Sequence, residues 1–237
     1  MSERVTRIAQ AYPERVEVRG RDLTGDLMGR LTFTEYFYFL LTGEEPSEDQ
    51  RYFLDLLLVA IAEHGMMPSN IAARMTLAAD PDSLQGAVAA GILGAGPVVL
   101  GTSEECARLL QGTLADDADP AEVVRAMRRV PGFGHPVHKP VDPRAERILE
   151  LADERGVSGE HVALARRFHA VVDLTMNVSM PIAAVLLDLG FPSAAVKGVP
   201  ILARTASLLA HLAEEREHPL GFQLARAAEE AADYRND

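Results

Sequence analysis

Residues 131–145 read Pro-Gly-Phe-Gly-His-Pro-Val-His-Lys-Pro-Val-Asp-Pro-Arg-Ala and are the most informative part of the chain. Glycines and prolines forbid a continued helix over residues 131–140, so we expect a shaped loop there. Asp142 followed by Pro143 is typical of an N-cap and the first position of a helix. We therefore expect the loop to lead directly into a helix that stops near Gly156.

The rest of the chain is also predicted to be helical. Apolar residues recur with helical spacing and alternating β-branched runs are almost absent, so the sequence predicts an all-α fold. Ser47 and Gln50 form a capping-box pattern before a helix that Gly65 is suited to close, which places His64 at a helix end. Other helix starts are expected at Asp119–Pro120, at Ser158 for a helix reaching about Met176, and at Pro200.

Size and composition limit the classes of protein that fit. With 237 residues and 48% hydrophobic residues, the chain is long enough to bury a core, so we expect a single domain over 1–237 with a possible small lobe at about 120–200. A net charge of -12 opposes nucleic acid and anionic membranes. No apolar run approaches the roughly 20 residues of a spanning helix. A single cysteine, Cys106, and no secretion signal at the start favour the cytoplasm.

A glycine-dense apolar segment covers residues 91–101. Glycine lets a backbone approach another element closely. This pattern leaves two alternatives open, tight helix packing or approach to a ligand.

His135 is the first candidate for a functional residue. It lies between glycine and proline in the loop and is followed by His138, Lys139 and Arg144. Backbone N–H groups and cations converging there would bind a carboxylate or a phosphate. The alternatives are a histidine bonded to a backbone carbonyl in a turn, or a metal pair with His138. Because two histidines without a third ligand are a weak zinc pattern, we expect no metal.

Several motifs together resemble the citrate synthase superfamily. The segment 132–135 continuing to 142–145 is similar to its histidine loop and Asp-Pro-Arg helix start, and 63–65 is similar to its Asp-His-Gly motif. Residues 18–23 and 40–46, Asn177-Val178, and Arg204 with His211 and Glu214 agree in the same order along nearly the whole chain.

The resemblance implies a short version of the helical citrate synthase-like fold, forming a homodimer with active sites near the subunit interface. It also implies that His64, His135, Arg144 and Arg204 surround the dicarboxylate part of a substrate. Guanidinium groups hold carboxylates bidentately, and histidines donate to a hydroxyl or a developing carbonyl oxygen. For the CoA part, the resemblance points to Gly132, Phe133, Gly134 and Lys139.

The sequence differs from the family pattern at three places, and these differences narrow the choice of reaction. The segment Gly96-Pro97-Val98-Val99-Leu100-Gly101 lacks the histidine that synthases use, which the citryl-CoA lyase branch also lacks. Ser179 stands where the family has an aspartate, and a hydroxyl alone is a poor base for a carbon acid. Arg216 is the nearest candidate for the arginine that the family supplies from a partner subunit.

We therefore expect a lyase that cleaves citryl-CoA, or a related 3-hydroxy-acyl-CoA, to an acyl-CoA and a keto acid by retro-aldol chemistry. His135, His64 and Ser179 are the expected catalytic positions. No cofactor is expected beyond CoA as part of the substrate. A diverged condensing enzyme that uses another acyl-CoA, and a CoA-binding partner subunit without turnover, stay as alternatives.

Overall fold

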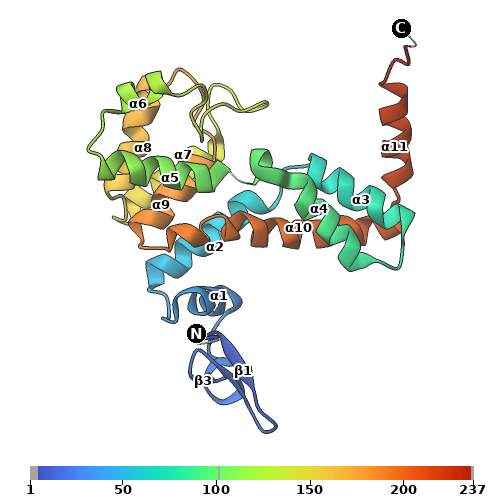
Figure 1. The fold of residues 1–237 in the computed structure, drawn as a ribbon, viewed down its shortest axis with the longest axis horizontal. Helices are drawn as coiled ribbons and strands as arrows, with labels where there is room; N and C mark the ends of the chain where they lie inside the picture. The colour runs from blue at the N-terminus through green and yellow to red at the C-terminus, as the bar shows by residue number, and fades with distance from the viewer. Residues whose placement is uncertain (1–4, 101, 236–237) are drawn as a thin grey trace.

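The structure is a computed structural model that describes residues 5–100 and 102–235. Helices dominate it, which confirms the predicted helical fold (Figure 1). A small antiparallel sheet near the N-terminus was not predicted, because its strands have only two or three residues and show no alternation. Its strands, in the order β1-β2-β3, are β1 (Ala9–Ala11), β2 (Val16–Val18) and β3 (Arg21–Asp22).

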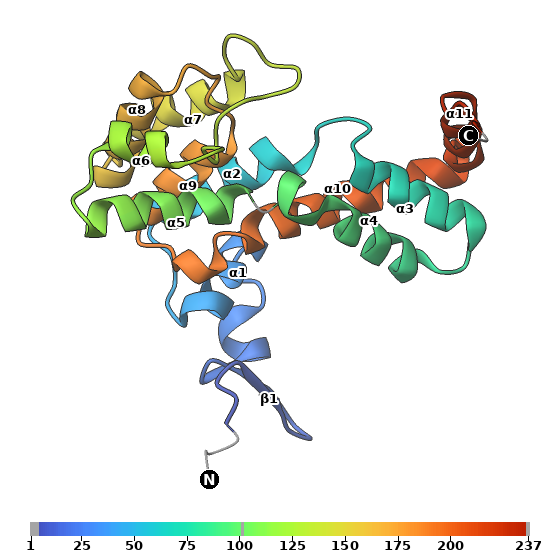
Figure 2. The same ribbon diagram turned by 45° about the horizontal axis from the view of Figure 1, so that its top comes forward.

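The sheet belongs to an N-terminal unit that projects from the body of the molecule (Figures 1 and 2). It continues through a single π-helical turn, η1 (Leu23–Leu27), into α1 (Phe33–Thr42). Val18, Leu27 and Phe39 form a small core of their own here.

Two long helices run through the centre of the molecule, α2 (Glu48–Ala62) and α10 (Gly198–Glu217), and they pack against each other. The predicted capping box of Ser47 and Gln50 is present. α2 ends at Ala62, and Glu63 is already extended, so His64 lies just beyond the helix. Gly65 then turns the chain with a φ of 73°.

A bundle on one side of this pair holds most of the hydrophobic core (Figure 1). Asp119 and Asp142 cap the helices predicted after them, and α9 is the most buried element of the bundle. The bundle consists of α5 (Thr102–Ala115), α6 (Pro120–Ala126), α7 (Pro143–Glu154), α8 (Glu160–Val171) and α9 (Ser179–Asp188), and the short 3-10 turn η2 (Ser193–Ala195) leads from it to α10.

The prediction of a helix from Ser158 to about Met176 is wrong at its far end, because α8 stops at Val171. At its start, the carboxylate of Asp188 accepts hydrogen bonds from the backbone N–H groups of Gly159, His161 and Val162. Residues 172–178 instead run back as an irregular segment, in which Met176 pairs with Phe133. A contact across more than 40 residues therefore outweighs the local helical pattern.

The remaining helices form a limb on the other side of α2 and α10 (Figure 2). They are α3 (Pro68–Ala79), α4 (Leu84–Val99) and α11 (Gly221–Glu230). A Cβ at Gly91 would lie 2.7 Å from Leu208 and 3.0 Å from Ala73, so this part of the glycine-dense segment serves tight helix packing. Gly101 lies outside the described residues. Across 5–100 and 102–235, no helix combines the length and apolarity needed to cross a membrane.

Candidate active site

A pocket of about 240 Å³ lies where the bundle meets the central helices. It collects residues from five separate parts of the chain: the end of α2 with the turn after it, the start of α5, the loop leading into α7, the start of α9, and α10. Six of the residues predicted from sequence line it, namely His64, Gly134, His135, Arg144, Ser179 and Arg204.

The loop before α7 is held in place by a short antiparallel pairing with residues 175–177. The Gly134 N–H donates to the Thr175 carbonyl at 2.7 Å, and the Asn177 N–H donates to the Gly132 carbonyl at 2.9 Å. Gly132 has a φ of 82°, and a Cβ there would lie 2.8 Å from both Cys106 Sγ and Met180 Cβ. Only glycine fits this position, so Gly132 has a packing role.

His135 is fixed by the backbone that follows it. Its Nδ1 accepts hydrogen bonds from the backbone N–H groups of Val137 at 3.1 Å and His138 at 2.8 Å. With Nδ1 occupied as an acceptor, the neutral ring carries its proton on Nε2. Burial and the neighbouring His138 lower the pKa of His135, which favours this neutral form. His135 Nε2 is thus a donor directed into the pocket region.

Arg144 provides a second donor at the same point. Its Nη2 lies 3.5 Å from His135 Nε2, so two donors approach each other without an acceptor from the described chain between them. An anionic or hydroxyl oxygen would satisfy both groups. Asp142 orients Arg144 by accepting from its Nε at 3.0 Å and from its Nη2 at 2.9 Å.

Asp142 is fully buried and ties three elements together. Besides holding Arg144, it caps α7 and accepts from the Val178 N–H at 3.1 Å. Burial alone would raise the pKa of Asp142, but the hydrogen bonds and charge of Arg144 outweigh this and lower it. The sequence predicted Asp142 as a helix cap. It did not predict the ion pair of Asp142 with Arg144, although the two residues are only two positions apart.

Arg204 is the most unusual residue of the pocket. Only 2% of it is exposed, and its Nε and Nη1 have no hydrogen-bond partner in the described part of the chain. Burial, together with the like charge of Arg144, lowers the pKa of Arg204, while Glu63 acts in the opposite direction. A buried guanidinium with unsatisfied donors is costly unless a ligand completes it.

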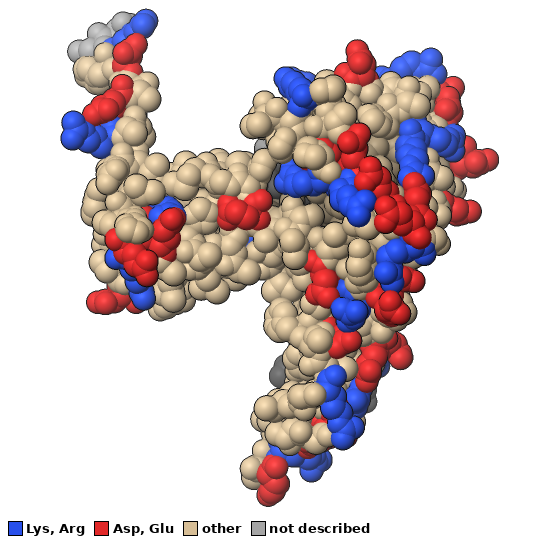
Figure 3. Space-filling view, turned by 180° about the vertical axis from the view of Figure 1, so that it is seen from behind, with Lys and Arg blue, Asp and Glu red and all other residues tan. Residues whose placement is uncertain are grey.

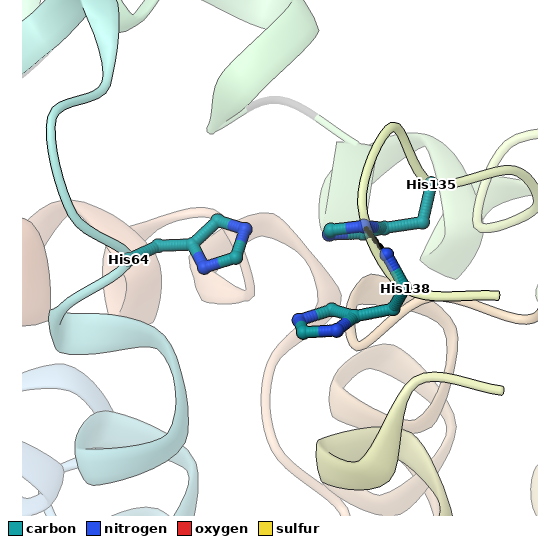
Figure 4. Close-up of side chains that lie close together, drawn as sticks. All are labelled: His64, His135 and His138. Carbon is teal, nitrogen blue, oxygen red and sulfur yellow. Dashed lines mark hydrogen bonds between the residues drawn. The ribbon is translucent and has the colours of Figure 1, made fainter.

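His64, His135 and His138 form an imidazole cluster (Figure 4). The ring centres of His64 and His135 lie 5.3 Å apart, and those of His135 and His138 are stacked at 4.4 Å. Burial and the charge of Arg144 lower the pKa of His64. No hydrogen bond joins the His64 ring to another described residue, so its nitrogens are available to a ligand.

The cluster supplies the third histidine that the sequence did not place, with ligand atoms all within 4.8 Å of one another. Two features oppose a metal ion. His135 Nδ1 is engaged by two backbone N–H groups, so Nε2 of the neutral ring has no lone pair to offer. Arg144 and Arg204 also make the surroundings cationic. The arrangement is better suited to hydrogen bonding with an anion.

The start of α9 forms the remaining wall. Ser179 is its first residue, and the Ser179 N–H donates to Asn177 Oδ1 at 3.0 Å. Asn177 also donates to the Gly134 carbonyl at 3.0 Å, which connects this wall to the histidine loop. Among the described residues that line the pocket, there is no aspartate or glutamate.

Four of the predicted substrate-binding residues do not line the pocket: Gly132, which packs against Cys106 and Met180, and the three described next. Phe133 is 8% exposed and belongs to the main hydrophobic core. Lys139 is exposed on the loop, and Arg216 is exposed in the last turn of α10. The roles given to these residues from sequence therefore stay predictions.

Comparison with known proteins agrees with this fold. A family model for the citrate synthase C-terminal domain matches residues 3–227. The citrate synthases of Haloferax volcanii and Synechocystis are 28% and 30% identical over 76% and 78% of this chain, and they are covered over 51% and 50% of their own length. The chain thus spans about half the length of these curated relatives.

Solved structures of related enzymes are also similar to this chain. Citryl-CoA lyase from Hydrogenobacter thermophilus superposes with a TM-score of 0.88 and 30% identity, covering 98% of this chain and 94% of that chain. The ATP citrate lyase of Methanosaeta concilii, solved with (3S)-citryl-CoA, shares the fold with a TM-score of 0.81 at 20% identity, over 98% of this chain and 42% of that chain. The chain belongs to the citrate synthase family.

Proposed function

We propose that the chain is a C–C bond lyase that cleaves citryl-CoA, or a related 3-hydroxy-acyl-CoA, to an acyl-CoA and a keto acid. The observation that carries this proposal is the unsatisfied, buried guanidinium of Arg204 in a pocket shared with Arg144 and two imidazoles. A substrate carboxylate would supply the missing acceptor. The likeness to citryl-CoA lyase from Hydrogenobacter thermophilus supports the same class of reaction.

Binding and chemistry are divided among different residues in this proposal. Arg204 and Arg144 hold the carboxylates of the citryl group, as planar guanidinium groups do well. His135 keeps its Nε2 proton and donates a hydrogen bond to the hydroxyl oxygen, which becomes a carbonyl oxygen as the C–C bond breaks. A donor fixed in advance at an oxygen whose charge changes is an effective source of catalysis.

His64 is the group proposed to take the hydroxyl proton. Its lowered pKa leaves the ring neutral near pH 7 and able to accept a proton, whereas His135 Nδ1 is engaged by the backbone. Removal of the proton forms the keto acid, and the bonding electron pair moves into the thioester enolate. The sequence left open whether His135, helped by His64, takes the hydroxyl proton or stabilises the oxygen; the hydrogen bonds at His135 favour the second role.

The enolate must then take up a proton on carbon. Ser179 has no carboxylate for this step, and no other described residue of the pocket wall does. The proton that His64 has accepted, or one from water, completes the reaction and leaves atoms and charges balanced. We expect this step to limit the rate, because carbon protonation without a positioned acid is slow.

The CoA part of the substrate is proposed to lie over the loop before α7. Gly134 lines the pocket, and the exposed Lys139 five residues later is available to a phosphate group. The ATP citrate lyase of Methanothrix soehngenii has been solved with citrate and coenzyme A, which supports a CoA ligand for this fold. CoA enters as part of the substrate, and the proposal requires no separate cofactor.

We propose a homodimer built through the limb. Figure 3 shows few charged residues over much of the limb face, in contrast to the mixed charges of the bundle. Exposed apolar side chains on the limb include Met75 on α3 and Leu93 on α4, and Leu209 is exposed on the neighbouring α10. Burying such residues would stabilise an association, and Arg216 would then be available to a partner's site.

A cytoplasmic location and a lobe at about 120–200 also stay proposals.

The test is turnover of citryl-CoA by the wild-type chain, followed as equal release of acetyl-CoA and oxaloacetate. Acetyl-CoA and oxaloacetate are offered in a parallel assay for condensation. Cleavage supports the proposal, and condensation alone would favour the diverged synthase. Binding of CoA and citrate without either reaction would favour a partner subunit without turnover, an alternative motivated by Ser179.

A further inference from the structure

A set of hydrogen bonds behind the pocket connects the turn that carries His64 to the helix that carries Arg204. It is centred on Glu63, which does not line the pocket. Glu63 Oε1 accepts from the backbone N–H groups of His64 at 2.8 Å and Gly65 at 2.6 Å. One carboxylate oxygen therefore fixes the backbone at the point where His64 leaves α2.

The other oxygen is anchored on α10. Glu63 Oε2 accepts from the Ser207 hydroxyl and lies 3.1 Å from His211 Nε2. Ser207 and His211 are three and seven residues after Arg204, so they lie along the same helix. Although half of the Glu63 side chain is exposed, both of its oxygens are engaged.

His211 is itself held in one orientation. Arg74, which is 1% exposed, directs its Nη2 and Nε to His211 Nδ1 at 2.9 and 3.2 Å. Arginine only donates, so Nδ1 is the acceptor and Nε2 carries the proton toward Glu63. Asn70 Nδ2 donates to the Gly65 carbonyl at 2.7 Å, which ties the turn to α3.

The charge of Glu63 is consistent with this role. Burial would raise its pKa, but the hydrogen bonds from Ser207, the His64 N–H and His211 outweigh this and lower it to about 2. Glu63 is thus ionised across the physiological pH range. It also attracts the charge of Arg204, whose Nε and Nη1 have no partner in the described residues.

We infer that Glu63 is a positioning residue that locks His64 to Arg204, so that a histidine and an arginine 140 positions apart act as one rigid substrate-binding unit. This inference rests on the proposed function, because it assigns His64 and Arg204 to the substrate. Glu63 acts through the residues that it holds in place and does not touch the reacting atoms. The carboxylate is needed because a neutral amide accepts through only one of its two terminal atoms.

The test is a double-mutant cycle on citryl-CoA cleavage with Glu63→Gln and His64→Ala in the full chain. Glu63→Gln should lower kcat by roughly 10–100-fold, as removal of groups that orient a site residue typically does. In the His64→Ala background the same change should have little further effect, because the residue it positions is gone. Equal losses in both backgrounds would overturn the inference.

Two further variants separate positioning from folding. Ser207→Ala removes one anchor at a residue that is 7% exposed, and it should lower kcat in the same direction by a smaller factor. Glu217→Gln alters an exposed carboxylate at the end of α10, away from this set of hydrogen bonds, and should leave kcat unchanged. A loss with Glu217→Gln as large as that with Glu63→Gln would show a general structural effect and contradict the inference.

A readout independent of turnover distinguishes failure of this inference from failure of the proposed function. In a chain labelled with nitrogen-15 histidine, the His64 signals are those missing from His64→Ala among the seven histidines. Glu63→Gln and Ser207→Ala should shift or broaden these signals while Glu217→Gln leaves them in place. Unchanged His64 signals in Glu63→Gln would refute positioning, even if the wild type cleaves citryl-CoA.

Discussion

Replacement of Arg204 by methionine should separate ligand binding from stability. Without ligand, the guanidinium is buried and two of its three nitrogens lack a partner in the described residues. Leaving a buried donor unsatisfied costs about 1–3 kcal/mol, so an apolar side chain of similar length should restore that amount. Loss of the attraction to Glu63 offsets part of the gain. We expect the free energy of unfolding of Arg204→Met to be unchanged or up to about 3 kcal/mol higher.

The affinity of Arg204→Met for citrate should fall, although its stability is kept. Truncating one partner of a buried, hydrogen-bonded charge pair costs about 2–5 kcal/mol. This corresponds to a Kd for citrate that is roughly 30- to 5,000-fold higher. The loss should be confined to the carboxylate ligand, while CoA binding changes little.

The assay is thermal unfolding with and without citrate, with calorimetry for the Kd. At 100 times its Kd, citrate should stabilise the wild type by about 2.7 kcal/mol. Arg204→Met should lose this stabilisation, whereas the control Arg226→Met, at a side chain 82% exposed on α11, should keep it. A strongly destabilised Arg204→Met that binds citrate normally would refute the assignment of this residue.

Further substitutions and pH test the other groups. His135→Ala should abolish C–C cleavage in a folded chain, because the loop donor is lost; full activity in a chain with an unchanged melting temperature would contradict this. Ser179→Asp should speed deuterium exchange into the methyl group of acetyl-CoA, since a positioned base is worth about 10²–10⁴-fold; faster exchange in the wild type would show that another group is the base. Burial, aided by neighbouring positive charge, lowers the pKa of His64, so kcat/KM should be full above pH 6.5 and fall as the pH drops through a value below 6.5. A falling limb centred above pH 6.5 would show that the neutral imidazole is not the reactive form.

Local patterns predicted the parts of the fold whose partners are close in sequence. The caps at Ser47, Asp119 and Asp142 depend on residues two or three positions away, and all three are present. The loop at residues 131–140 follows from its glycines and prolines in the same way.

Long-range contacts account for what the sequence could not predict. The end of α8 at Val171 depends on pairing with residues near Phe133, and its start depends on Asp188. The proton position on His135 follows from two backbone N–H groups, and nothing in the composition of the loop specifies their direction. His138 was considered as a nearby cation or as a metal partner of His135, and the stacking of its ring on that of His135 was not predicted.

The same difference between local patterns and long-range contacts applies to the candidate site. Resemblance to a family placed His64, His135, Arg144 and Arg204 together, and the structure brings these four residues to one pocket. The reason that Arg204 needs a ligand is visible only in three dimensions, because it depends on burial and on missing partners. Glu63 was noted only as part of the segment 63–65, and its role was not predicted because its partners on α10 are about 145 residues away.

A crystal structure of the chain with citrate and CoA bound tests the central claim most directly. The account predicts a citrate carboxylate within hydrogen-bond distance of Arg204 Nε and Nη1, and the citrate hydroxyl oxygen between His135 Nε2 and Arg144 Nη2. The thiol end of CoA should lie near Ser179. Citrate bound elsewhere, with the Arg204 guanidinium still lacking a partner, would contradict the account.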